Sequence, residues 1–198
     1  MKNRCHCKVE FLPTMLLPLI ALSVLGGALA QVPGVNKCPD ITTDSHFNVT
    51  KFLGRWYEAE KFFVIFEAFG KCITADYTAG QNGTMNMVNR QISTVTRGSS
   101  SVGGIVYTPD ASQPGKLKAL LNIGLFHPET DFWVLGTDYQ KYAIIYTCVN
   151  LHLANLQFAW ILTRERNPPD SVITQARTVA ASQGLDTSRF MKTDQKDC

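Results

Sequence analysis

The chain has 198 residues and a formal net charge of +3, with 45% hydrophobic and 18% charged residues. This length suits one domain that can bury a substantial core. Because no run of Lys or Arg follows the first few residues, nucleic acid is not expected as the main partner.

Residues 1–30 are predicted to be a signal peptide that is removed, leaving one domain over residues 31–198. A basic start precedes the apolar residues 15–25, and Ala28-Leu29-Ala30 supplies the small residues that a signal peptidase needs. The alternative is a membrane anchor over residues 11–35, but two prolines and a Gly-Gly pair interrupt that stretch. Removing three basic residues and one acidic residue lowers the net charge from +3 to +1.

From residue 54 onward, runs rich in Val, Ile, Thr, Tyr and Phe alternate with turn residues. They predict eight strands, over residues 54–62, 71–79, 84–94, 101–108, 115–122, 131–137, 142–149 and 155–164. The short connections favour an up-and-down antiparallel meander, and closing it into a barrel removes both exposed edges. The expected fold class is therefore all-β, an eight-stranded barrel whose lumen can hold one small ligand.

One C-terminal α-helix is expected to follow the strands and to pack outside the barrel. Asn167 is predicted to cap it, Pro168 and Pro169 suit its first turn, and Gly184 is predicted to end it. A short extended piece over residues 189–193 then leads to the last cysteine. The apolar face of the helix would consist of Val172, Ile173, Ala176, Val179 and Ala180.

Three short motifs fall at one end of such a barrel. Gly54-Arg55-Trp56 opens the first strand, Thr137-Asp138-Tyr139 ends the sixth and Arg164 ends the eighth. Because successive strands alternate in direction, all three lie together, and the Arg164 guanidinium can stack on the Trp56 ring. We expect them to close this end structurally and leave the other end open to a ligand.

Four cysteines remain after the leader, Cys38, Cys72, Cys148 and Cys198. An even number in an oxidising compartment predicts two disulfides, and spacing alone allows three pairings. Their spacing fits neither a redox pair nor a zinc site. Two sequons, at Asn48 and Asn82, predict N-glycosylation, although Asn82-Gly83 is also a strong hairpin turn.

The three motifs resemble the signature regions of the lipocalins, and the resemblance covers nearly the whole mature chain. It is greatest to the apolipoprotein D group and its invertebrate members, through the stretches GRWYEAEKF, KCITADYT, FWVLGTDYQKYAIIYTC, FAWILTR and TDQKDC. The resemblance implies the pairings Cys38–Cys148 and Cys72–Cys198. The sequons do not align with those of the vertebrate relative, so glycan positions are not carried over.

Two-residue alternation along the strands predicts which side chains line the lumen. Trp160 and Leu162 share a face with Arg164, which must cover the floor, so both should point inward. The expected ligand-binding set is Ala75, Tyr77, Met87, Asn89, Leu121, Trp133, Leu135, Trp160 and Leu162, several of which correspond to pocket positions in the resembled group. This lining suits a fatty acid, sterol or similar lipid with one polar end. The alternative is that these side chains simply fill the barrel.

Two connections at the open end are unusually apolar for a secreted protein. They contain Phe63, Ile65 and Phe66 between the first two strands, and Ile123, Leu125 and Phe126 between the fifth and sixth. We expect such loops to contact a membrane, a lipoprotein surface or a partner. In the alternative, Phe62, Phe66 and Phe69 fold inward and cap the lumen.

We expect a secreted, extracellular carrier without a cofactor rather than an enzyme. His46, His127 and His152 are scattered, and no catalytic or metal-binding arrangement is visible. Two other functions stay open: a carrier of a bilin or carotenoid pigment, and a signalling protein that binds a partner through the Phe-rich rim. The sequence leaves the ligand's identity and the oligomeric state undetermined.

Overall fold

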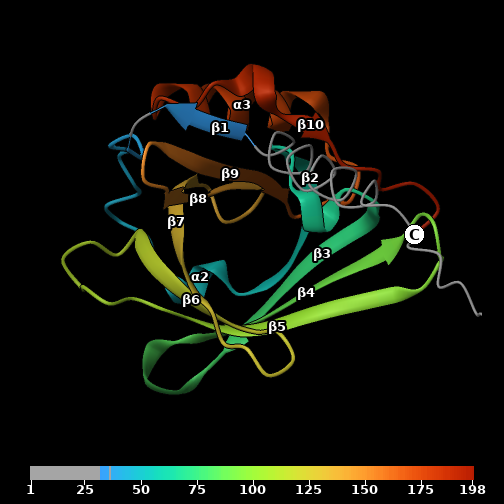
Figure 1. Cartoon of the computed structure of the whole chain (residues 1–198), viewed down its shortest axis with the longest axis horizontal. Coiled ribbons are helices and arrows are strands. Elements are labelled where there is room, and N and C mark those ends of the chain that lie inside the picture. The colour runs from blue at the N-terminus through green and yellow to red at the C-terminus, as the bar shows by residue number, and fades with distance from the viewer. Residues whose placement is uncertain (1–31, 36) are drawn as a thin grey trace, which may run out of the picture.

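The computed structural model describes residues 32–35 and 37–198, so the expected leader over residues 1–30 lies outside the described residues. Its strands form one antiparallel sheet that closes into a barrel, because β9 pairs with both β8 and β2 (Figure 1). The strands are β1 (Val32–Val35), β2 (Gly54–Lys61), β3 (Gly70–Ala79), β4 (Met85–Ser93), β5 (Ser99–Tyr107), β6 (Lys116–Asn122), β7 (Glu129–Thr137), β8 (Tyr142–Asn150), β9 (Ala154–Thr163) and β10 (Met191–Lys192).

The eight expected strands are confirmed as β2 to β9, and their ends differ from the predicted ones by at most two residues. Each pairs with its neighbour in chain order, as a meander requires. β1 continues the wall beside the part of β9 that β2 does not reach, and β10 pairs with the last residues of β2. The closed all-β barrel is therefore as expected, with two short strands added.

The floor of the barrel is closed as the sequence predicts. The short helix α2 (Val49–Phe52) brings the Phe52 ring against Trp56, with 5.1 Å between ring centroids, and Trp56 Nε1 donates to the Phe52 carbonyl at 2.9 Å. The Arg164 guanidinium lies 3.7 Å from the centroid of the Trp56 ring. Its N–H groups also donate to the carbonyls of three floor residues, Leu53, Arg55 and Tyr139.

Local geometry explains the residue types in the floor motifs. Gly54 has a φ of +104°, and a Cβ at this position would lie 3.0 Å from Arg164 Nη1, so both backbone conformation and space favour glycine. The carboxylate of Asp138 fixes the turn between β7 and β8. Its Oδ1 accepts the backbone N–H groups of Gln140, Lys141 and Tyr142.

Helix α3 (Asp170–Ser182) packs on the outside of the barrel, as expected (Figure 1). The predicted cap at Asn167 is wrong: Pro169 occupies the cap position and makes no side-chain cap hydrogen bond. The two prolines explain the later start, since a residue that precedes proline is disfavoured in helical conformation. The predicted end at Gly184 is confirmed, because its φ is +89° and its N–H donates to the Ala181 carbonyl at 2.9 Å.

Two disulfides join the cysteines in the pairing that the resemblance implies, Cys38–Cys148 and Cys72–Cys198. The second anchors the C-terminal tail, which lies between β2 and β3 where these strands no longer pair. Thr193 N donates to the Ala59 carbonyl of β2 at 2.9 Å, and Cys72 N on β3 donates to the Asp194 carbonyl at 2.8 Å. The tail is therefore part of the barrel wall.

Candidate functional site

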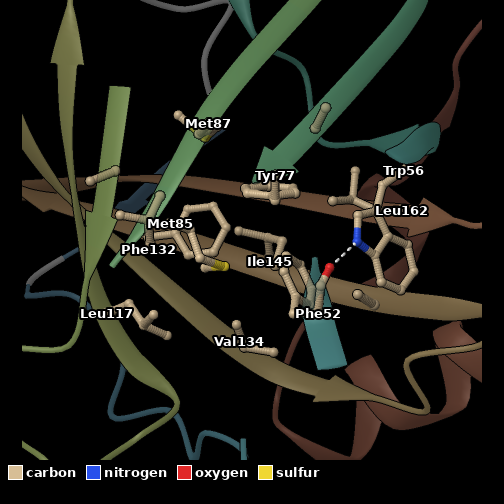
Figure 2. Packing of buried hydrophobic residues seen from close by; sticks show 14 of the residues in the cluster. Phe52, Trp56, Tyr77, Met85, Met87, Leu117, Phe132, Val134, Ile145 and Leu162 are labelled. Atoms are coloured by element: carbon tan, nitrogen blue, oxygen red, sulfur yellow. Dashed lines mark hydrogen bonds between the residues drawn. The ribbon is translucent and has the colours of Figure 1, made fainter. Parts of the chain in front are cut away.

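The barrel contains a cavity of about 460 Å³ at the end opposite the floor. Apolar side chains from six strands line its inner part. Figure 2 shows five of them, Tyr77, Met87, Phe132, Ile145 and Leu162, packed in one cluster with the floor residues Phe52 and Trp56. Burial among these side chains raises the pKa of the Tyr77 phenol above its ordinary value, so the phenol stays neutral.

Seven of the nine residues expected to face the lumen line this cavity: Ala75, Tyr77, Met87, Asn89, Leu121, Trp160 and Leu162. Sequence reasoning did not name Phe132 and Ile145, which belong to the same lining.

 Of the seven, two each lie on β3, β4 and β9 and one lies on β6, and these four strands set the positions of the expected lining.

The prediction that Trp133 and Leu135 face the lumen is wrong. Both lie on the outer face of β7, where Leu135 is buried in the cluster beneath α3 and the Trp133 ring packs 6.2 Å from Tyr146. Phe132 and Val134 face inward instead. The helix covers the outer face of β7, so this strand is apolar on both faces and its alternation carries no information about which face is inside.

Three charged residues and a tryptophan form a cluster beside the cavity near its mouth, and we call Glu58, Lys61, Glu67 and Trp160 the mouth cluster. Lys61 Nζ lies 3.0 Å from Glu58 Oε1 and 2.9 Å from Glu67 Oε2. Trp160 Nε1 donates to Glu67 Oε2 at 3.4 Å, and Thr193 Oγ1 of the tail donates to Glu58 Oε1 at 2.6 Å. The cluster therefore joins β2, β9, the C-terminal tail and the loop between β2 and β3.

A bulge in β2 sends neighbouring charged side chains to opposite faces of the wall. The register between β2 and β9 shifts between Glu58 and Glu60. Glu60 consequently points outward and pairs with Arg177 of α3 at 2.7 Å, whereas Glu58 and Lys61 are both directed to the mouth cluster. Burial, together with the nearby Glu67 carboxylate, raises the pKa of Glu58 to about 8.

Comparison with known proteins identifies the family. A profile described as the Lipocalin / cytosolic fatty-acid binding protein family matches residues 53–197. The chain belongs to the lipocalin family. Apolipoprotein D of Mus musculus is 34% identical over 189 residues, which cover 93% of this chain and 98% of that protein.

Two insect proteins extend the comparison. The bilin-binding protein of Pieris brassicae is 28% identical over 150 residues, covering 75% of this chain and 78% of that protein. The solved structure of insecticyanin from Manduca sexta has a TM-score of 0.75 and 27% identity, covering 83% of this chain and 89% of that one. The expected resemblance to apolipoprotein D and its invertebrate relatives is therefore confirmed.

The open end of this lipocalin carries exposed apolar side chains on several loops. Leu125 is 94% and Phe126 75% exposed between β6 and β7, and Ile65 and Ile123 are also exposed, whereas Phe63 is half-buried. Sequence reasoning missed the loop between β8 and β9, where Leu153 is 83% exposed. We call the exposed residues Ile65, Phe66, Phe69, Ile123, Leu125, Phe126 and Leu153 the apolar rim.

The alternative in which three phenylalanines cap the lumen is wrong for two of them. Phe62 is buried on the outer side of the wall against Phe190, with 4.8 Å between ring centroids, and Phe69 is exposed. Phe66 contributes to the lining of the cavity although most of its side chain is exposed. The lumen therefore opens beside the rim rather than beneath a lid of three rings.

The remaining candidates for chemistry lie apart from the lumen. His46, His127 and His152 are exposed. Among the described residues, no group of His, Cys, Asp and Glu side chains could hold a metal ion. Within the same part of the chain, no helix is both long enough and apolar enough to cross a bilayer.

Proposed function

We propose that this lipocalin is a secreted carrier, not an enzyme, that binds a small hydrophobic ligand with one polar end in its lumen. The observation that carries the proposal is the cavity of about 460 Å³, apolar toward a closed floor and polar near an open mouth. Pockets of this size and lining bury most of the surface of a small ligand. Two disulfides support secretion, because such bridges persist in oxidising compartments.

Binding would depend on removal of apolar surface from water. Each Å² of apolar area that the ligand buries contributes about 25 cal/mol, so an acyl chain or a sterol ring system supplies most of the affinity. The apolar part would lie toward Phe132 and Ile145, and the polar end toward the mouth. The disulfides and the Trp56–Arg164 floor keep the cavity formed without a ligand.

A substitution that fills the lumen tests this proposal. Ala119 lines the cavity, whereas the adjacent Leu120 is exposed on the outer face of the same strand. We expect Ala119→Trp to abolish binding of a fluorescent fatty-acid analogue, and the matched control Leu120→Trp to bind it like the unmodified chain. Equal binding by both variants would place the probe outside the lumen and contradict the proposal.

A pigment carrier is the alternative within the same fold, since a similar insect protein is named for bilin binding. Visible absorbance that copurifies with the secreted protein would favour a bilin or carotenoid over a colourless lipid. A signalling protein with a filled barrel is less well supported, because the lumen retains a cavity. Partner binding that is insensitive to competing lipid would favour that alternative.

The apolar rim supports a second candidate function, association with a membrane or lipoprotein surface. Exposed apolar residues gathered on adjacent loops are typical of interaction sites. We expect Leu125→Ser with Phe126→Ser to reduce cosedimentation with phosphatidylcholine vesicles without changing the affinity of the lumen for the fluorescent probe. Ile105→Ser, on the outer wall, is the matched control. Undiminished cosedimentation of the double variant would refute this function.

A further inference from the structure

Two amide oxygens in the lumen wall point to the chemistry of the ligand's polar end. Asn89 Oδ1 and Gln91 Oε1 are buried and have no hydrogen-bond partner among the described residues. Both side chains belong to β4 and line the cavity. Buried acceptors without partners are rare because each loses its hydrogen bonds to water without replacement. A donor supplied by a ligand would remove this cost.

The amide nitrogen of Gln91 already has a hydrogen-bond partner, and this contact orients the amide group. Gln91 Nε2 donates to the Phe66 carbonyl of the mouth loop at 3.4 Å, so Oε1 is the atom left for a further contact. Asn89 pairs in register with Ala75, and Gln91 lies two residues nearer the mouth on the same face of β4. The two acceptors therefore extend from the apolar part of the lumen toward its opening.

The basic groups near these acceptors are already paired. Lys61 lies between the carboxyl groups of Glu58 and Glu67, at 3.0 and 2.9 Å. Arg90, which contributes to the lining, forms an ion pair with Asp76. An anionic head group at the mouth would therefore lie close to the carboxyl groups of Glu58 and Glu67, and both neighbouring cations, Lys61 and Arg90, are already bonded to acids.

We propose, on the basis of the carrier function proposed above, that the lumen prefers lipids whose polar end is an uncharged hydrogen-bond donor. A hydroxyl or a primary amide donates to Asn89 Oδ1 or Gln91 Oε1. A carboxylate can only accept hydrogen bonds, and an ester offers no donor. Asn89 and Gln91 thus determine specificity for the head group, whereas the apolar wall holds the chain.

Four ligands with the same acyl chain length and unsaturation separate these effects: oleyl alcohol, oleamide, methyl oleate and oleate. Each competes with an apolar fluorescent probe for the full secreted chain at pH 7.5. One additional hydrogen bond makes oleyl alcohol and oleamide bind about five- to tenfold more tightly than methyl oleate or oleate. Methyl oleate binding as tightly as the alcohol, or oleate binding most tightly, would overturn the proposal.

Variants assign the preference to the two amides. Asn89→Leu and Gln91→Leu should each reduce the ratio of alcohol to ester affinity toward one, without weakening methyl oleate. Asn86→Leu, an exposed position on the same strand, should keep the original ratio.

Unchanged affinity ratios in both lumen variants would refute the assignment to these two amides. The ligand series on the unmodified chain decides the head-group preference even where a variant fails to fold. If none of the four ligands displaces the probe, the carrier function itself fails; equal displacement by all four refutes the head-group preference alone.

Discussion

Replacing Glu58 with glutamine should change how the stability of the protein depends on pH. Glu58 is buried, and both of its close contacts, with Thr193 and Lys61, are made by Oε1. Glutamine keeps an oxygen at that position but cannot ionise. The variant therefore isolates the effect of the negative charge from the effect of the side chain's shape.

The magnitude follows from the raised pKa of Glu58, about 8 in the folded protein against an ordinary value of 4.5. Between these two pH values the folded state holds a proton that the unfolded state has released, so the free energy of unfolding falls as pH rises through this window. A difference of this size corresponds to at most about 5 kcal/mol. In Glu58→Gln the free energy of unfolding should not fall in this way as pH rises, because the glutamine side chain has no proton to release.

Denaturant unfolding of both proteins, followed by tryptophan fluorescence from pH 5 to pH 9 with the disulfides intact, measures the difference. The two should have similar stability at pH 5, and Glu58→Gln should be more stable by several kcal/mol at pH 9. The exposed Glu165→Gln variant provides the control for substitution of a glutamate elsewhere. A stability difference that stays constant over this range, or that favours the unmodified chain as pH rises, would refute the reasoning.

Three further predictions concern the floor, the tail and the surface. Arg164→Gln should lower the free energy of unfolding by about 3 kcal/mol, because the stacking on Trp56 and charged hydrogen bonds are lost, and an unchanged denaturation midpoint would contradict this. Removing the Cys72–Cys198 bridge with two serines should cost up to about 5 kcal/mol, since it closes a separation of 126 residues; unfolding at the original denaturant concentration would argue against it. Asn48 and Asn82 are exposed, so N-glycosidase should reduce the mass of the secreted protein by two glycans. Asn48→Gln and Asn82→Gln should each reduce this mass change by one glycan, and an undiminished mass change in both variants would exclude both sites.

The strands and the floor could be predicted because their signals are local. Asn82 and Gly83 both have positive φ, at 53° and 78°, so the predicted turn between β3 and β4 has a direct backbone cause. Arg164 could be placed on Trp56 from strand direction alone. Each of these inferences needed only a short stretch of sequence and the rule that neighbouring strands run in opposite directions.

The mouth of the lumen could not be predicted because it depends on contacts between distant segments. The bulge that separates Glu58 from Glu60 is not visible in the alternation of β2. Thr193 reaches Glu58 across 135 residues of chain, and only the folded tail brings them together. The outward position of Leu135 likewise depends on the covering helix α3, which the strand's own sequence does not reveal.

Native mass spectrometry of the secreted protein tests the carrier proposal most directly. We expect the unmodified chain to retain one small molecule that organic solvent extracts, and Ala119→Trp, which fills the lumen, to lack it. Identification of an extracted lipid with a hydroxyl or amide end would agree with both proposals. A chain that retains no small molecule and binds none of the four oleyl ligands would contradict the central claim that this lumen is a binding site.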